Sequence, residues 1–306
     1  MLARRARRSA ARIGLVLMYH EISPVHGGPD DVLPALGADL FRVQLEHLRD
    51  SYEVVPLREL LARAEGRRAG DRIPVAITFD DDLSNHAAVA APMLEEFGFP
   101  ATFFLCGNTL DGPSPFWWQD LQAILDRGPE AWEECRRELA RTWPWAALDG
   151  RRSDFTNTIE AGPPELRDAV ATKLREIAGS DVLDEGLSPE AVRDLAGRGF
   201  EIGFHTLRHY RLETLTGDAL DRAMSEGIDV LSEAAGTRPT SIAYPHAKAD
   251  LRVAEVAQRA GFERGYLVGD LPTTAEQHPL LLTRVGAGTD SLPIFKWVLG
   301  RAAAAD

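Results

Sequence analysis

The sequence predicts an α/β fold, a (β/α) barrel of about seven parallel strands with a helical insertion. Three observations support this prediction. Short apolar runs recur along the chain, helical patterns separate them, and one long segment, 111–186, interrupts the alternation. Alternating strands and helices imply a parallel sheet, and about seven such units favour a closed barrel over a small open sheet.

The predicted strands are nearly continuous in apolar residues, as is typical of strands that are covered on both faces. They are Ile13–Tyr19, Val75–Phe79, Ala101–Leu105, Glu201–Phe204, Thr240–Tyr244, Gly265–Val268 and Leu281–Val285. Helical patterns lie between several of them, at Asn85–Phe97, Ser188–Ala196, Asp218–Ala235 and Leu251–Ala260. Ser188 followed by Pro189 is typical of an N-cap and a first helical turn.

The segment 111–186 contains no convincing strand, and it holds five of the six tryptophans, Trp117, Trp118, Trp132, Trp143 and Trp145. We interpret it as a helical, tryptophan-rich insertion within a single domain that spans 1–306. Because it follows the strand Ala101–Leu105, we expect it to cover one side of the barrel mouth at the carboxyl ends of the strands.

Charge and hydropathy exclude several partners. The net charge of -13 argues against nucleic acid or an anionic membrane, since both require clustered basic residues. The start, Met1–Arg12, is rich in arginine and could begin an export signal, but the apolar run Ile13–Met18 is too short for one. No stretch reaches transmembrane length. We therefore expect a cytoplasmic protein, and Cys106 and Cys135 indicate no disulfide framework.

Three successive acids end the segment Thr78–Asp82, directly after a predicted strand. Neighbouring carboxylates raise one another's pKa, and a metal ion that takes one or two of them as ligands removes that conflict. An exposed acidic turn would give the same sequence. The segment alone does not decide between the two.

A second cluster, His205-Thr206-Leu207-Arg208-His209, follows another predicted strand. Two histidines four residues apart suit one metal ion, although a surface and a core histidine would give the same spacing. Both clusters follow strands, where barrel enzymes collect their active sites. Together they predict a site of two histidines and one carboxylate, open to water as in catalytic zinc sites, with a second aspartate as general base.

These motifs resemble those of the polysaccharide deacetylases, carbohydrate esterase family 4 with its NodB-homology fold. Thr78–Asp81 and His205–His209 match its first two motifs, and Thr240–Pro245 is similar to a variant third motif. Ala91–Phe104 and Gly199–Phe204 resemble the family's helix, strand and approach to the histidines. The resemblance covers about 13–110 and 187–295, outside the insertion.

The resemblance implies a general base at Asp80 and a divalent metal ion held by Asp81, His205 and His209. Zinc is the expected metal, and two nitrogens with one carboxylate also suit cobalt, nickel or iron. A water activated by the metal would attack the amide carbonyl, and the backbone N–H of His246 would help to hold the oxyanion. His246 and Tyr244 would contact the substrate.

The chain departs from the family pattern at several positions. Asp82 replaces the usual Gly and adds negative charge beside the predicted metal. The third motif lacks its arginine near Ala243 and reads Pro245-His246-Ala247 instead of Pro-Tyr-Gly. No carboxyl-terminal Leu-x-Leu-His supplies a general acid, since the chain reads Leu-Leu-Thr-Arg-Val at Leu281–Val285.

A circularly permuted subgroup of exopolysaccharide deacetylases takes its acid from an N-terminal Met-Tyr-His, and this chain has Met18-Tyr19-His20. That resemblance implies His20 as general acid, with His246 as the alternative. Arg284 lies at the end of a predicted strand, and we expect it to replace the missing third-motif arginine and to orient Asp80. The tryptophans of the insertion would either stack on a sugar or form a small core of their own.

The expected reaction is therefore removal of an N-acetyl or similar small acyl group from an amino sugar. Cleavage of another small C–N bond, a formamide or a cyclic amide, and a non-catalytic carbohydrate-binding role are the alternatives. Retention of the three ligands and the base argues against the non-catalytic role. A cytoplasmic location would favour a soluble biosynthetic intermediate over a finished wall polymer, and the oligomeric state stays open.

Overall fold

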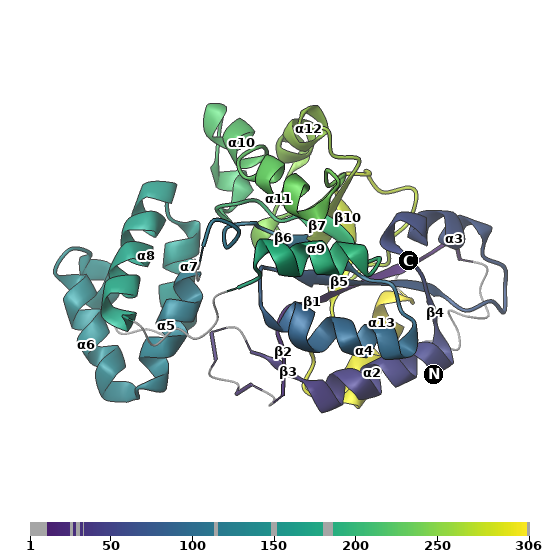
Figure 1. The fold of residues 1–306 in the computed structure, drawn as a ribbon, viewed down its shortest axis with the longest axis horizontal. Coiled ribbons are helices and arrows are strands. Elements are labelled where there is room, and N and C mark those ends of the chain that lie inside the picture. Colours follow the sequence, from purple (N-terminus) through teal and green to yellow (C-terminus); the bar gives the residue numbers. More distant parts are fainter. Residues whose placement is uncertain are drawn as a thin grey trace.

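The chain folds into a closed parallel barrel surrounded by helices (Figure 1). The structure is a computed structural model that describes residues 11–24, 27–28, 31–32, 34–112, 116–147, 152–179 and 186–304. Residues 1–10 of the arginine-rich start lie outside the described residues. Among the described residues, no helix is both long and apolar enough to cross a lipid bilayer.

Seven parallel strands form the barrel, in the spatial order β1-β10-β9-β8-β7-β6-β5, and β1 pairs with both β10 and β5 to close it. Its strands are β1 (Leu15–Tyr19), β5 (Pro74–Asp80), β6 (Thr102–Leu105), β7 (Glu201–Phe204), β8 (Ser241–Ala243), β9 (Arg264–Val268) and β10 (Leu282–Gly286). The predicted fold class and all seven predicted strands are confirmed, with bounds that differ by at most two residues.

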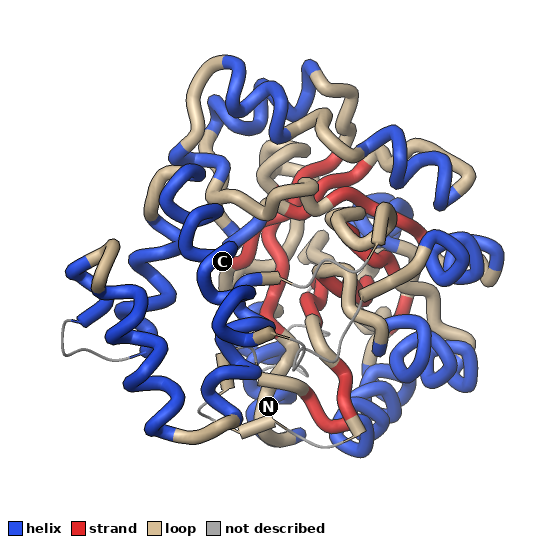
Figure 2. Tube along the Cα trace, turned by 60° about the vertical axis from the view of Figure 1, so that its left-hand side comes forward, coloured by secondary structure: helices blue, strands red, loops and turns tan. Residues whose placement is uncertain are grey.

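Short strands extend this core. β4 (Glu53–Val54) pairs with β5 outside the ring, and β2 (Ile22–Ser23) pairs with β3 (Leu36–Gly37) in a separate two-stranded sheet. The helices around the barrel, blue in Figure 2, are α2 (Ala38–Ser51), α3 (Leu60–Gly66), α4 (Ala91–Phe97), α9 (Pro189–Gly197), α10 (Asp218–Ala223), α11 (Ile228–Ala235), α12 (Leu251–Arg259) and α13 (Leu292–Ala302).

The barrel strands turn alternate side chains inward and outward, as the two-residue period of a strand requires. Along β5, Ile77 and Phe79 join the core cluster shared with the surrounding helices. Ala76 belongs to a second cluster inside the barrel. Thr78 and Asp80 follow Ala76 on this inner face, so that the strand delivers a polar side chain to the barrel mouth at its carboxyl end.

Strand β7 shows the same alternation. Gly203 and His205 are two residues apart, and a side chain at position 203 would collide with the ring of Phe104, which helps to fill the barrel. The glycine therefore leaves room for that ring, while His205 continues on the inner face beyond the end of the strand.

Two predicted helices differ from the structure. The helix expected over Asp218–Ala235 is two helices, α10 and α11, separated at Gly227, whose φ of 81° lies in the left-handed region. The apolar periodicity continues across this break and conceals it. The helix expected over Asn85–Phe97 begins with a π-helical turn, His86–Ala90, before α4. Ser188 caps α9 as predicted, and its hydroxyl accepts the Ala191 N–H at 3.2 Å.

The segment predicted as an insertion contains α5 (Trp117–Asp126), α6 (Pro129–Ala140), α7 (Arg152–Ala161) and α8 (Pro164–Ala178), which lie together on one side of the barrel (Figure 1). These helices share a hydrophobic cluster of their own, distinct from the two barrel clusters. Both cysteines are free and buried, Cys106 beside the barrel and Cys135 within α6.

Candidate metal centre and active site

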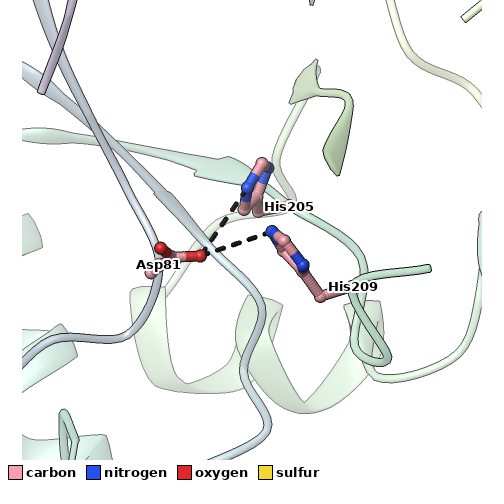
Figure 3. A group of neighbouring side chains, drawn as sticks. All are labelled: Asp81, His205 and His209. Carbon is pink, nitrogen blue, oxygen red and sulfur yellow. Dashed lines mark ion pairs between the residues drawn. The ribbon is translucent and has the colours of Figure 1, made fainter. Parts of the chain in front are cut away.

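Asp81, His205 and His209 meet at the carboxyl end of the barrel. The Asp81 Oδ1 atom lies 3.8 Å from His205 Nε2 and 3.6 Å from His209 Nε2 (Figure 3). All three side chains are buried, and one ligand atom from each lies within 4.8 Å of the others. The two clusters that the sequence placed after separate strands therefore form one group.

These residues fit a divalent cation. Burial, followed by the charges of Asp80 and Asp82, raises the pKa of Asp81 well above its ordinary value, and its Oδ1 has no hydrogen-bond partner among the described residues. A cation would supply that partner and remove the penalty on the charged form. Burial also lowers the pKa of His205 to about 4 and that of His209 well below its ordinary value, which favours the neutral imidazoles that bind metals.

His205 is held in the orientation that a ligand needs. Its Nδ1 lies 2.8 Å from the carbonyl oxygen of Ala243, to which an N–H at this position donates. This hydrogen bond leaves Nε2 free to face Asp81. The backbone N–H of His205 donates to Leu105 O at 2.8 Å, so the sheet register fixes where the ring leaves the chain.

Asp80 lies beside this group and is paired with Arg284. Two Arg284 nitrogens each lie 2.6 Å from one Asp80 oxygen, and both side chains are buried. Burial, the largest single influence, would raise the pKa of Asp80, but the charge and hydrogen bonds of Arg284 together with the nearby His205 and His20 lower that pKa to about 2. Asp80 Oδ2 is also 3.9 Å from His205 Nε2. The structure thus places an ionised, oriented carboxylate against the candidate metal ligands.

A cavity of about 250 Å³ opens over these side chains. It is lined by Met18, His20, Val32, Asp80, Asp81, Trp118, Glu160, His205, His209, Tyr244, His246, Ala247, Val268 and Arg284. His20 continues the inner face of β1 two residues beyond Met18. Burial lowers the pKa of His20, and Asp80 opposes that shift. Every residue that the sequence singled out for the site therefore lines one cavity.

A family model described as polysaccharide deacetylase matches residues 67–135 and 157–265, more than half of the chain. The chain belongs to the polysaccharide deacetylase family. The match continues into the insertion, so the expectation that the resemblance stops at residue 110 is wrong. His20 and Arg284 lie outside the matched residues, and the match does not distinguish the permuted subgroup.

Solved structures of deacetylases share this fold. The Streptococcus pyogenes deacetylase PplD in complex with acetate has a TM-score of 0.62 and 18% identity, over 95% of this chain and 98% of its own. A de-N-acetylase from Aggregatibacter actinomycetemcomitans has a TM-score of 0.61 and 15% identity, over 93% and 98%. IcaB from Ammonifex degensii has a TM-score of 0.57 and 17% identity, over 96% and 97%. A comparison with curated proteins finds no significant match.

Asp82, where this chain departs from the family pattern, directs its carboxylate to backbone N–H groups of the loop after β6. Its Oδ1 accepts the Cys106 N–H at 2.8 Å, and its Oδ2 accepts the Asn108 N–H at 3.0 Å. Burial raises the pKa of Asp82 to about 6 against the opposing effect of these backbone donors. The carboxylate of Asp82 therefore stabilises the loop that follows β6 by accepting two backbone hydrogen bonds.

The third motif contributes Tyr244, His246 and Ala247 to the lining of the same cavity. His246 and Ala247 have φ of 55° and 59°, a left-handed conformation that is strained for residues with side chains. The Tyr244 hydroxyl donates to Leu280 O at 2.9 Å, so its polar end is engaged in the fold. His246 Nδ1 lies 3.4 Å from Glu160 Oε2. Substrate contact by these two residues stays a prediction.

The insertion reaches the site as predicted. Trp118 lines the same cavity as His205, and its ring centroid is 4.9 Å from that of His209. Trp132, Trp143 and Trp145 instead pack against the hydrophobic cluster of the insertion. Trp117 and Trp118 are buried members of the same cluster, so the interpretation of a small core is confirmed, while stacking of Trp118 on a sugar stays a prediction.

Sequence reasoning missed two polar residues of the insertion. Glu160 lines the cavity, and Arg167 donates from Nη1 to the backbone carbonyl of His209. Neither belongs to a motif or to a strand end. No local pattern marked them, because their place depends on how the helices of the insertion pack against the barrel.

Proposed function

We propose that this deacetylase-family hydrolase removes an acetyl or similar small acyl group from the nitrogen of an amino sugar. The observation that carries the proposal is the meeting of three candidate metal ligands with the Asp80–Arg284 pair in one cavity. A non-catalytic sugar-binding protein would have no need for a buried, charge-compensated carboxylate beside such a group.

Asp80 is the proposed general base. Arg284 keeps its carboxylate ionised and fixes its direction, so Asp80 is ready to take a proton from the attacking water. A divalent ion held by Asp81, His205 and His209 would act as a Lewis acid that polarises the carbonyl and makes a water more acidic. Zinc is the proposed ion, with cobalt, nickel or iron as alternatives of similar ligand preference.

His20 is the proposed general acid, as in the permuted subgroup. An amine leaves an amide only when its nitrogen receives a proton, and His20 lines the cavity beside Asp80. The backbone N–H of His246 is proposed to stabilise the oxyanion, while the side chains of His246 and Tyr244 contact the substrate.

The family supports an acetylated sugar as substrate, and acetate in the related PplD structure supports acetyl as the group released. We further propose a cytoplasmic protein acting on a soluble intermediate. The free, buried Cys106 and Cys135 are compatible with a reducing compartment. Detection of the native protein in the membrane or extracellular fraction of its cells would contradict this location.

The decisive experiment combines metal analysis with a substrate panel. Purified protein is expected to contain one divalent ion per chain and to release acetate from at least one N-acetyl amino sugar, free, nucleotide-linked or oligomeric. Release of formate but not acetate from N-acyl sugars would favour the other C–N hydrolase. Metal-loaded protein that binds sugars and releases neither acid would support the binding role.

A further inference from the structure

The two histidine ligands are held in different ways. The Nδ1 atom of His205 has the carbonyl of Ala243 as partner, whereas the buried Nδ1 atom of His209 has no hydrogen-bond partner among the described residues. His209 also has a φ of 49°, in the left-handed region. A left-handed backbone is strained for a residue with a side chain and persists only where the surrounding structure holds it. Contacts other than a hydrogen bond to Nδ1 must therefore hold the backbone and the ring of His209.

The backbone carbonyl of His209 provides one such contact. It accepts a hydrogen bond from Nη1 of Arg167, which comes from α8 in the insertion and is only 6% exposed. The guanidinium carbon of Arg167 lies 4.9 Å from the ring centroid of Tyr210, the next residue along the chain. A planar, charged donor thus holds the chain on both sides of the peptide bond between His209 and Tyr210.

The same carbonyl has a second neighbour. His246 Nε2 lies 3.3 Å from His209 O, and the opposite nitrogen, Nδ1, lies 3.4 Å from Glu160 Oε2. Glu160 belongs to α7 of the insertion. The imidazole of His246 therefore links a carboxylate of the insertion to the backbone of a candidate metal ligand.

Aromatic rings from the insertion enclose the His209 ring itself. The ring centroids of Trp118 and Phe116 lie 4.9 and 5.9 Å from that of His209. Phe116 and Trp118 stack on each other with centroids 4.2 Å apart. Packing thus restricts the ring where a hydrogen bond to Nδ1 would ordinarily do so.

We propose that the insertion is part of the metal centre and that Arg167 is a positioning residue for His209. Glu160 supports the same carbonyl through His246. Holding the carbonyl fixes the Cα of His209, and the aromatic wall then directs its Nε2 towards Asp81. This inference rests on the proposed metal site, because it assigns the residues that hold one of its ligands.

The test measures the zinc affinity of the full metal-free chain by competition with a chelator. Arg167→Met is expected to weaken zinc binding roughly 10–100-fold, the usual effect of removing a group that orients a ligand. Arg167→Lys, which keeps a cationic donor, should recover part of that loss. Glu160→Gln should weaken binding less, by up to about tenfold.

Arg175→Met is the matched control. Arg175 lies on the same helix and pairs with Asp120 inside the insertion at 2.6 Å. It is expected to lower the thermal stability of the metal-free protein without changing zinc affinity. Equal losses of affinity in Arg167→Met and Arg175→Met would mean that a loosened insertion is the cause, and the inference would be wrong.

Unchanged zinc affinity in folded Arg167→Met would also overturn it. If Arg167→Met does not fold, the zinc affinities of Arg167→Lys and Glu160→Gln are measured in its place. Affinities equal to that of the unmodified chain in both variants would refute the inference. His209→Ala separates a wrong ligand assignment from a wrong positioning role. If His209→Ala keeps its zinc, the ligand assignment and the proposed function fail; if it loses zinc while the Arg167 variants bind normally, only the positioning role fails.

Discussion

Arg284 on β10 and Asp80 at the end of β5 form two parallel hydrogen bonds of 2.6 Å inside the barrel, although 204 positions separate them in the chain. Arg284 also donates to the Thr78 hydroxyl at 3.2 Å. The arginine is fully buried and forms its ion pair with Asp80. The last strand of the barrel thus sets the orientation and charge of the carboxylate proposed as base.

Replacement of Arg284 tests this relationship. In Arg284→Met, Asp80 stays buried without its counter-charge, so we expect a loss of about 3–5 kcal/mol in the free energy of unfolding. Turnover should fall by roughly 10²-fold or more, since the base loses both its orientation and its charged form. Urea unfolding and the rate of acyl release measure the two effects. A variant as stable and as active as the unmodified protein would contradict the prediction.

The ligand assignment predicts that Asp81→Ala and His209→Ala lose the metal and the activity while staying folded. Each removes one of three ligand atoms, and the remaining two bind a divalent ion weakly. Metal content by mass spectrometry and folding by circular dichroism are the measurements. Full metal occupancy in either variant would rule out that residue as a ligand.

Asp80→Asn should keep the metal and lose turnover, because it removes a proton acceptor and leaves the three ligands in place. The rate of acyl release and the metal content are measured on the same preparation. If Asp80→Asn instead abolishes metal binding and Asp81→Asn does not, the roles of the two residues are reversed.

Asp82→Ala should separate structure from metal binding within the acidic cluster. It leaves the backbone N–H groups of Cys106 and Asn108 without their acceptor, at an expected cost of about 2–4 kcal/mol. Metal content should stay at one ion per chain. Loss of the metal from a folded Asp82→Ala protein would show that this carboxylate is also needed to hold it.

The strands could be predicted from sequence because each is buried on both faces, and the predicted metal ligands could be found because they directly follow strand ends. The Asp80–Arg284 pair was suggested by a missing family arginine, but its burial became clear only in the closed barrel. Periodicity could not reveal the break at Gly227, since the apolar face of α10 continues into α11.

The polar residues that the insertion contributes to the site could not be predicted from the sequence, for a different reason. Its placement beside the site followed from the strand it leaves, and Trp118 confirms it. Which of its polar residues reach the site depends on the packing of α5, α7 and α8 against the barrel. Glu160 and Arg167 occur in ordinary charged helical sequence, where exposed ion pairs are the usual outcome.

The proposed role of His20 depends on where β1 ends. Val16 and Met18 face the inside of the barrel and the cavity, and His20 follows with the same period. Its carbonyl lies 3.2 Å from Nε2 of the buried His86, which fixes the chain as it leaves the strand. His20 therefore reaches the cavity from the side opposite to His246, at a point set by the strand and not by a mobile loop.

His20→Ala should cut turnover by roughly 10²–10⁴-fold and leave the metal content unchanged, because it removes a proton donor and no ligand. Substrates with a better leaving group need less help from an acid, so the loss should shrink for an activated aryl ester or anilide. His246→Ala is the comparison, since His246 lines the same cavity and is the alternative acid. A nearly normal rate in His20→Ala, with the leaving-group dependence appearing in His246→Ala instead, would move the acid to His246 and remove the support for the permuted subgroup.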